Sequence, residues 1–254
     1  MLNRQAANVL DLVEYFARRR RPATIAEIAD DNGWPRSSAF NIVSTLADRG
    51  YLYEPAPRGG YYPSPRWLAM ARATAEAEPL PDALHALVDR IAVESGETTA
   101  IGAPAGTSAI FIHVVESPQP IRYFAQPGHR LPIQATATGR ALLTQMSRRE
   151  RDSLYRKIRF ERHTDAPPGA EAVEAEIAAA AARGYHRSIA EYSPDLLGVA
   201  LPVPLGGRLL SLTIAGPVSR CFGRMEALAR LLADGLADLR HHLPQSRAGE
   251  ADAT

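Results

Sequence analysis

The stretch GWPRSSAFNIVSTLADRGYLYEPAPRGGYYPS, residues 33–64, decides the fold of the first part of this chain. It predicts a helix over 35–49 that ends at Gly50, because glycine readily adopts the left-handed conformation that closes a helix. Two short strands are expected next, over 51–54 and 60–62, joined by the turn PAPRGG. The stretch therefore combines a helix, a glycine stop and a hairpin.

The predicted helix over 35–49 has two unlike faces. Apolar residues at helical spacing form one stripe, which we expect to be buried: Ala39, Ile42, Val43 and Leu46. The opposite stripe carries Ser37, Phe40, Asn41 and Ser44. Hydroxyl and amide side chains of this kind contact bases and phosphates when a helix lies in the major groove, and a phenyl ring can contact a thymine methyl group. Taken singly, each of these residues is better explained by a solvated surface.

Two further helices are expected before this one. A capping box in TIAE, formed by Thr24 and Glu27, predicts the start of a helix that Gly33 ends. An amphipathic helix is predicted over 6–17, followed by an arginine run at 18–21 that we expect near DNA phosphates. Three helices and a hairpin in so few residues predict a winged helix-turn-helix. The candidate DNA-binding residues are Arg36, Ser37, Ser38, Phe40, Asn41, Ser44 and, at the hairpin tip, Arg58.

Composition limits the function classes. The chain has 254 residues, 46% of them apolar and 22% charged, with a net charge of +1, so any DNA binding must come from local placement of basic groups. The one cysteine, Cys221, and the spacing of the histidines predict neither a disulfide framework nor a metal site. No cofactor is expected. The N-terminus lacks the form of a signal peptide, and a cytoplasmic location is predicted.

The second part of the chain has a different sequence pattern. From Thr98 onward, β-rich segments alternate with helical ones such as ATATGRALLTQM and EAVEAEIAAAAARG. The segment IRYFAQPG, residues 121–128, is also predicted to be a strand. Hairpins rather than strict strand–helix alternation indicate an α+β domain with an antiparallel sheet flanked by helices.

Three blocks in this order resemble the IclR family of bacterial transcription regulators. They are ATIAEIADDNGWPRSSAFNIVSTLADRGYL, LPIQATATGRALLTQM and GYHRSIAEYSPDLLGVALPVPLGGRLLSLTIAGP. The resemblance implies a winged helix-turn-helix domain over 1–63, a linker helix over 64–78 and a GAF-like effector-binding domain over 79–243. A disordered tail is expected over 244–254. The resemblance also implies a homodimer or homotetramer that binds pseudo-palindromic operator DNA.

The resemblance further implies where an effector binds. The amides of Ala137 and Thr138 match positions that hold a small carboxylate, at a helix start suited to anions; Thr136 or Thr138 acting only as a helix cap is the alternative. Four other pocket positions depart from the family pattern of Asp, Cys, Ser and Ser, and here carry Ser188, Gly198, Thr213 and Ala215. Relative to the family pattern, the site loses a charge and side-chain bulk. We therefore expect an organic acid that is larger and flatter than a two- or three-carbon acid, such as an aromatic acid. An apolar wall beside it is expected from some of Tyr123, Ile121 and Phe124.

Two other function classes compete with a regulator. An enzyme is disfavoured, because the chain has no G-x-S-x-G, H-E-x-x-H, P-loop or G-x-G-x-x-G motif. A GAF-like sensor module without DNA binding is the alternative, and the outer face of the helix over 35–49 argues against it. Because Asn41 stands where the family commonly has Arg, an operator preference shifted toward adenine is expected.

Overall fold

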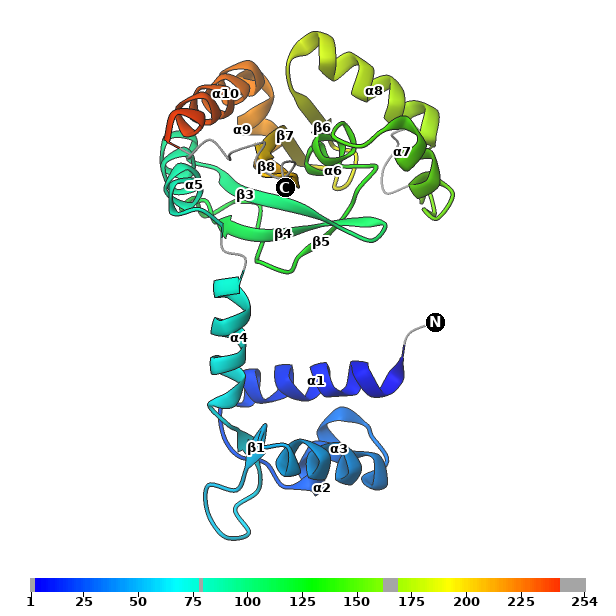
Figure 1. Cartoon of the computed structure of the whole chain (residues 1–254), viewed down its shortest axis with the longest axis vertical. Coiled ribbons are helices and arrows are strands. Elements are labelled where there is room, and N and C mark those ends of the chain that lie inside the picture. Colours follow the sequence, from blue (N-terminus) through cyan, green and yellow to red (C-terminus); the bar gives the residue numbers. More distant parts are fainter. Residues whose placement is uncertain (1–2, 78–79, 162–168, 243–254) are drawn as a thin grey trace, which may run out of the picture. The chain divides into compact units, whose positions relative to one another are not determined.

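A computed structural model describes residues 3–77, 80–161 and 169–242 (Figure 1). The chain divides into two compact units, residues 1–79 and 80–254. The expected tail over 244–254 lies outside the described residues.

The first unit has the predicted order of three helices, a hairpin and a fourth helix. Its elements are α1 (Arg4–Arg19), α2 (Ile25–Asn32), α3 (Arg36–Asp48), β1 (Leu52–Tyr53), β2 (Tyr62–Pro63) and α4 (Arg66–Ala77). The capping box of Thr24 and Glu27 is confirmed, and α2 ends at Gly33 with a left-handed φ of 64°. The buried cluster of this unit joins α1, α2 and α3 through Phe16, Ile28 and Val43.

The hairpin strands are shorter than predicted. Tyr61, expected in the second strand, pairs instead with Ala23 of the α1–α2 connection, through backbone hydrogen bonds of 2.8 and 3.0 Å. Gly60 permits this approach, because a Cβ there would lie 2.5 Å from the carbonyl carbon of Ala23 and its φ is +85°. The base of α4 packs on the hairpin, where the Trp67 indole donates to the Tyr51 carbonyl at 2.9 Å.

The second unit is a six-stranded antiparallel sheet with strand order β5-β4-β3-β8-β7-β6. Its strands are β3 (Thr98–Ala105), β4 (Ser108–Val115), β5 (Arg130–Pro132), β6 (His186–Ile189), β7 (Leu196–Leu205) and β8 (Arg208–Pro217). Its helices are α5 (Asp82–Ser95), α6 (Ala137–Leu143), α7 (Arg148–Tyr155), α8 (Ala170–Arg183), α9 (Val218–Cys221) and α10 (Met225–His242), with a 3-10 turn at Phe222–Arg224.

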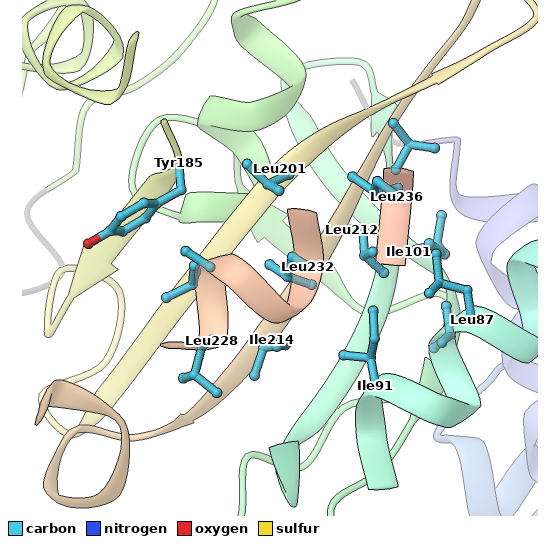
Figure 2. Packing of buried hydrophobic residues seen from close by; sticks show 14 of the residues in the cluster. Leu87, Ile91, Ile101, Tyr185, Leu201, Leu212, Ile214, Leu228, Leu232 and Leu236 are labelled. Carbon is cyan, nitrogen blue, oxygen red and sulfur yellow. The ribbon is translucent and has the colours of Figure 1, made fainter. Parts of the chain in front are cut away.

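One face of the sheet packs on α5 and α10. Alternate residues of the central strands, among them Ile101, Leu212 and Ile214, point toward this side, where Ile91 and Leu232 meet them (Figure 2). All five side chains are fully buried. This cluster is the main core of the second unit.

The opposite face carries α6 at close range, and small residues make that possible. Ala137 and Ala141 of α6 pack on Ala200 of β7. A Cβ added at Gly102 of β3 would lie 2.4 Å from the Thr138 methyl carbon. The start of α6 is therefore held against the middle of the sheet.

The predicted strand over 121–128 is wrong. This segment forms no strand. Side chains from elsewhere bind its carbonyl groups: the Thr98 hydroxyl donates to the Tyr123 carbonyl at 2.6 Å, and Arg220 donates to the Ile121 carbonyl at 2.9 Å. The aromatic and β-branched residues that suggested a strand belong instead to an extended loop beside β4.

Candidate functional site

The outer face of α3 is exposed, opposite a stripe that is buried at Ala39, Val43 and Leu46 and half-buried at Ile42. Ala39 and Val43 are 0% exposed, whereas Phe40 is 56% exposed. Arg36, Ser37 and Asn41 are exposed, and Ser38 and Ser44 are half-buried. Burial of Phe40 would contribute about 2 kcal/mol to folding, so an exposed phenyl ring on a polar face indicates a surface with another use.

The beginning of α3 is open to an anion. Pro35 is its N-cap residue, and no side chain within the described part of the chain caps the first amides. Such amides, together with the helix dipole, favour phosphate. Arg36 lies 3.4 Å from Asp30, but both side chains are about two-thirds exposed, so this ion pair leaves the guanidinium available.

Arg58 lies at the tip of the loop between β1 and β2, exposed and with a left-handed φ of 57°. Ser38 and Asn41 also line a groove of about 470 Å³ that separates α3 from the start of α1. The candidate DNA-binding residues thus occupy α3 and the hairpin loop.

One member of the arginine run, Arg19, departs from its expected role, whereas Arg18, Arg20 and Arg21 are exposed. Arg19 is only 12% exposed and bonds Glu27 and Asp31, so it joins α1 to α2. The Thr24 amide and Arg19 together lower the pKa of Glu27 to about 2. Arg19 is therefore a structural residue of the fold.

The seven predicted effector residues come together around one cavity. Tyr123, Ala137, Thr138, Ser188, Gly198, Thr213 and Ala215 line it, with Phe111, Leu131, Thr136, Tyr192 and Leu196. Its volume is about 20 Å³, room for about one water molecule. The described lining includes no charged side chain.

Hydroxyl groups hold the amide end of this cavity. The Ala137 amide donates to the Ser188 hydroxyl at 3.1 Å, and the Thr138 and Thr213 hydroxyls share a hydrogen bond of 2.9 Å. Thr136 caps α6, accepting from the Gly139 amide at 3.2 Å. Thr136 therefore caps α6, while the adjacent Ala137 and Thr138 form the polar end of the cavity.

Aromatic rings form the other wall. Phe111, Tyr123 and Tyr192 line the cavity, whereas Ile121 and Phe124 are 73% and 56% exposed and do not line it. The Tyr123 hydroxyl is buried, and no described residue hydrogen-bonds it. Burial, with a smaller contribution from Tyr192, raises the pKa of Tyr123. The phenol is therefore neutral and can serve a polar atom of a ligand.

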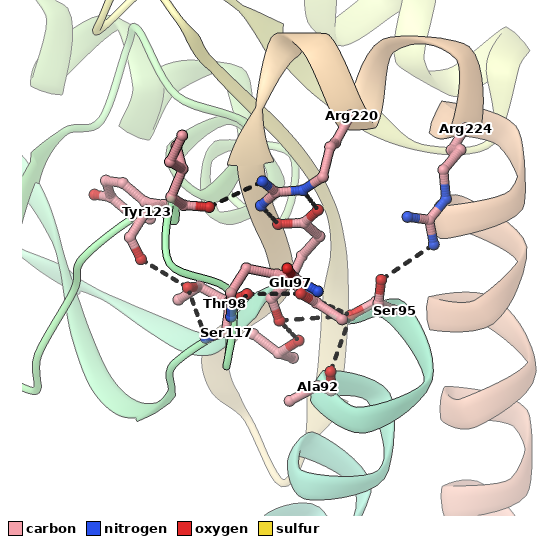
Figure 3. A network of polar contacts seen from close by, with 12 residues as sticks. Ala92, Ser95, Glu97, Thr98, Ser117, Tyr123, Arg220 and Arg224 are labelled. Carbon is pink, nitrogen blue, oxygen red and sulfur yellow. Dashed lines mark hydrogen bonds and ion pairs between the residues drawn. The ribbon is translucent and has the colours of Figure 1, made fainter.

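A polar network fixes the loop that carries Tyr123 (Figure 3). Glu97 is 1% exposed and receives two hydrogen bonds of 2.7 Å from Arg220. The Ser117 amide donates to the Thr98 hydroxyl at 3.1 Å, and that hydroxyl donates to the Tyr123 carbonyl. These hydrogen bonds thus fix the backbone of the loop that carries the Tyr123 ring.

A second tether holds the segment that carries Tyr192. Arg140 of α6 is 4% exposed, and its guanidinium bonds both carboxylate oxygens of Glu191 and the Arg187 carbonyl. Glu191 is absent from the cavity lining and acts as a partner of Arg140.

Five lining residues were missed by sequence reasoning. The sequence indicates Thr136 only as a helix cap. Phe111 faces the same side of the sheet as Ala109, and the period-2 alternation of β4 is a signal that identifies it. Leu196 begins β7 two residues before Gly198, so the same alternation identifies it. Leu131 lies on the edge strand β5 and Tyr192 in an irregular segment, where no periodicity marks the inward side.

Other chemistry finds little support. In the part of the chain that the structure describes, no group of three or more His, Cys, Asp or Glu residues is placed to hold a metal ion. No described helix is long and apolar enough to cross a membrane. Burial raises the pKa of the Cys221 thiol to about 12, which keeps it protonated and unreactive.

Comparisons with known proteins agree with this architecture. Residues 5–55 match the IclR helix-turn-helix domain, and residues 73–237 match the C-terminal domain of the bacterial transcriptional regulator IclR. The chain is 26% identical to the HTH-type transcriptional regulator BhcR of Paracoccus denitrificans over 251 residues, covering 97% of this chain and 88% of the relative.

Two crystal structures share the fold. Thermotoga maritima IclR aligns with a TM-score of 0.76 at 17% identity, covering 94% of this chain and 98% of that one. An IclR homologue from Microbacterium hydrocarbonoxydans, crystallised with 4-hydroxybenzoate, aligns with a TM-score of 0.71 at 21% identity, covering 93% and 99%. With both domain models matched in order over most of its length, this chain belongs to the IclR family of bacterial transcriptional regulators.

Proposed function

We propose that this regulator reads operator DNA with the outer face of α3 and with Arg58. The observation that carries the proposal is the exposure of Phe40 and Asn41 on the side of α3 opposite its buried stripe. Asn41 is suited to pair with an adenine edge through its amide, and Phe40 to contact a thymine methyl group. The uncapped start of α3 and Arg58 are suited to phosphates.

The proposed assembly is a homodimer or homotetramer in the cytoplasm. Two copies of α3 related by a two-fold axis would enter successive major grooves about 34 Å apart. The operator is then expected to be a pseudo-palindrome.

The proposed effector is a small organic acid, and an aromatic one fits the lining best. The amides at the start of α6 and the hydroxyls of Ser188 and Thr213 would receive the carboxylate, and Phe111, Tyr123 and Tyr192 would contact a ring. The 4-hydroxybenzoate bound to the Microbacterium homologue supports this class.

In this proposal the small size of the cavity couples effector binding to a conformational change. An aromatic acid is larger than a cavity that holds about one water molecule, so its binding must move part of the wall. A ligand shifts a conformational equilibrium only by its different affinity for the two states, and a cavity that must open supplies that difference.

The DNA-binding part is tested by a mobility shift with the promoter fragment beside the gene that encodes this chain. We expect a shift that weakens steeply as salt rises from 50 to about 200 mM. Arg58→Ala is expected to reduce the slope of log K against log salt by about 1, and Arg149→Ala, an exposed arginine of α7, to leave it unchanged. Absence of any DNA binding would favour the sensor module.

The effector part is tested by calorimetry with 4-hydroxybenzoate, benzoate, pyruvate and glyoxylate. Binding of the aromatic acids, with an altered mobility shift, is the expected result. Tight binding of pyruvate or glyoxylate without binding of either benzoate would contradict the aromatic assignment.

A further inference from the structure

A second pocket shares a wall with the effector cavity. It has a volume of about 510 Å³ and opens beside the edge strand β5. Leu131 and Tyr192 line both this pocket and the cavity. These two side chains therefore border both spaces.

The outer pocket is basic. Its charged lining residues are Arg130, Lys157, Arg159 and Glu161, so the described lining carries a net charge of +2. Arg130 is fixed, because its guanidinium donates to the Ala105 carbonyl at 3.1 Å. Lys157 and Arg159 follow α7 and are exposed. Lys157 is the only lysine of the chain. Among the described residues that line the two spaces, cations therefore occur only in the outer pocket.

We infer that the outer pocket is the entrance to the effector cavity, that its cations draw organic carboxylates toward it, and that Tyr192 is the gate between the two spaces. This inference rests on the proposed function in that the cavity is taken as the effector site. A cleft lined by one sign of charge raises the local concentration of the opposite ion and the association rate. The Arg140–Glu191 pair anchors the chain next to Tyr192, and the Tyr192 side chain borders both spaces.

The test needs no known effector and no DNA, so its failure is separate from failure of the proposed function. Ala215→Cys places a thiol in the cavity, where Ala215 is 6% exposed. The thiolate attacks a methanethiosulfonate, forming a disulfide and releasing methanesulfinate. The full-length chain is labelled with an anionic reagent, sulfonatoethyl methanethiosulfonate, and with the cationic trimethylammonium analogue, and the rates are followed by mass spectrometry. The unsubstituted chain gives the background, because its one thiol, Cys221, is buried.

Four results are expected in the Ala215→Cys background. Lys157→Gln with Arg159→Gln slows the anionic reagent about tenfold at low salt and does not slow the cationic one. High salt removes this difference, because it screens exposed charges. Glu161→Gln speeds the anionic reagent. Tyr192→Ala speeds both reagents to a similar degree.

A matched control removes the same charge elsewhere. Arg149→Gln with Arg156→Gln changes two exposed arginines of the same region that do not line the pocket, and it should leave both rates unchanged. Where Ala215→Cys lowers the unfolding temperature, Leu196→Cys places the thiol on another wall of the same cavity.

The inference is overturned if the pocket variants leave the anionic rate unchanged, if they slow both reagents equally, or if Tyr192→Ala alters neither rate. Any of these results would mean that the cavity is reached by another route.

Discussion

The Ser188 hydroxyl accepts a hydrogen bond of 3.1 Å from the Ala137 amide, 51 residues earlier in the chain. Ser188 lies on β6, paired with Gly198 of β7, while Ala137 begins α6. The bond therefore joins the sheet to the first turn of the helix that lies on it.

Ser188→Ala is expected to destabilise the second unit. The Ala137 amide would keep no acceptor in a buried setting, which costs about 1–3 kcal/mol. The free energy of unfolding, measured with urea, checks this. Ser219→Ala removes an exposed hydroxyl and should change it by less than about 0.5 kcal/mol. Equal effects of the two substitutions would show that the Ser188 bond contributes nothing.

Gly198→Ala is expected to fill the cavity and leave the fold intact. The new Cβ would lie 3.1 Å from the Ser188 hydroxyl oxygen and 3.4 Å from the Ala137 Cβ, which small shifts can accommodate. Any acid that raises the unfolding temperature of the unsubstituted chain should lose that effect, while DNA binding stays. Gly223→Ala, with nothing within 4 Å of its Cβ, is the control. An undiminished response in Gly198→Ala would place the effector elsewhere.

Arg220→Ala should destabilise the chain strongly, because it leaves the buried Glu97 carboxylate without its guanidinium partner. Breaking such a pair costs about 3–5 kcal/mol. Combining it with Glu97→Gln should recover part of the loss, since the uncompensated charge is gone. Urea unfolding of both variants measures this. If the double variant is no more stable than Arg220→Ala, the loss arises from packing of the arginine and not from charge.

Acid should weaken the contact between α7 and α8. Hydrogen bonds from Arg151, with further ones from Tyr155 and Arg148, lower the pKa of Glu174 from 4.5 to about 2. Since the folded pKa is below the unfolded one, the stabilisation is complete above pH 4.5 and is lost as pH falls toward 2. The stabilisation from this lowered pKa of Glu174 is on the order of 3 kcal/mol.

The stability difference between the unsubstituted chain and Glu174→Gln should therefore shrink between pH 4.5 and 2. Urea unfolding at a series of pH values measures that difference. Glu171→Gln, an exposed carboxylate of the same helix, should show little change. A difference that stays constant over this range would contradict the assigned ion-pair network.

Sequence reasoning was strongest where local chemistry and packing agree. The Thr24–Glu27 capping box, the stop at Gly33 and the buried stripe through Ala39, Val43 and Leu46 all follow from spacing and backbone preference. It failed over residues 121–128, because the Thr98 hydroxyl and the Arg220 guanidinium take carbonyl groups that propensity assigns to a sheet. Such partners are remote in sequence and leave no periodic signal.

The candidate sites show the same limit. Tyr192 follows a residue of positive φ, Ala190, in an irregular segment, and only its tertiary position brings it to the cavity. Arg19 belongs to a run that resembles a phosphate-binding cluster, but two acids of α2 bind it. In both cases the sequence shows the chemistry of the side chain but not which residues surround it in the fold.

Operator binding by α3 is tested most directly by fluorescence anisotropy with the promoter fragment, comparing the unsubstituted chain with Asn41→Ala and Phe40→Ala. Because both side chains are exposed, unfolding temperatures should stay unchanged. Asn41→Ala is expected to weaken binding by about 1–3 kcal/mol and to relax the preference at one base pair. Unchanged affinity in both variants, with DNA binding intact, would contradict the claim that the outer face of α3 contacts DNA.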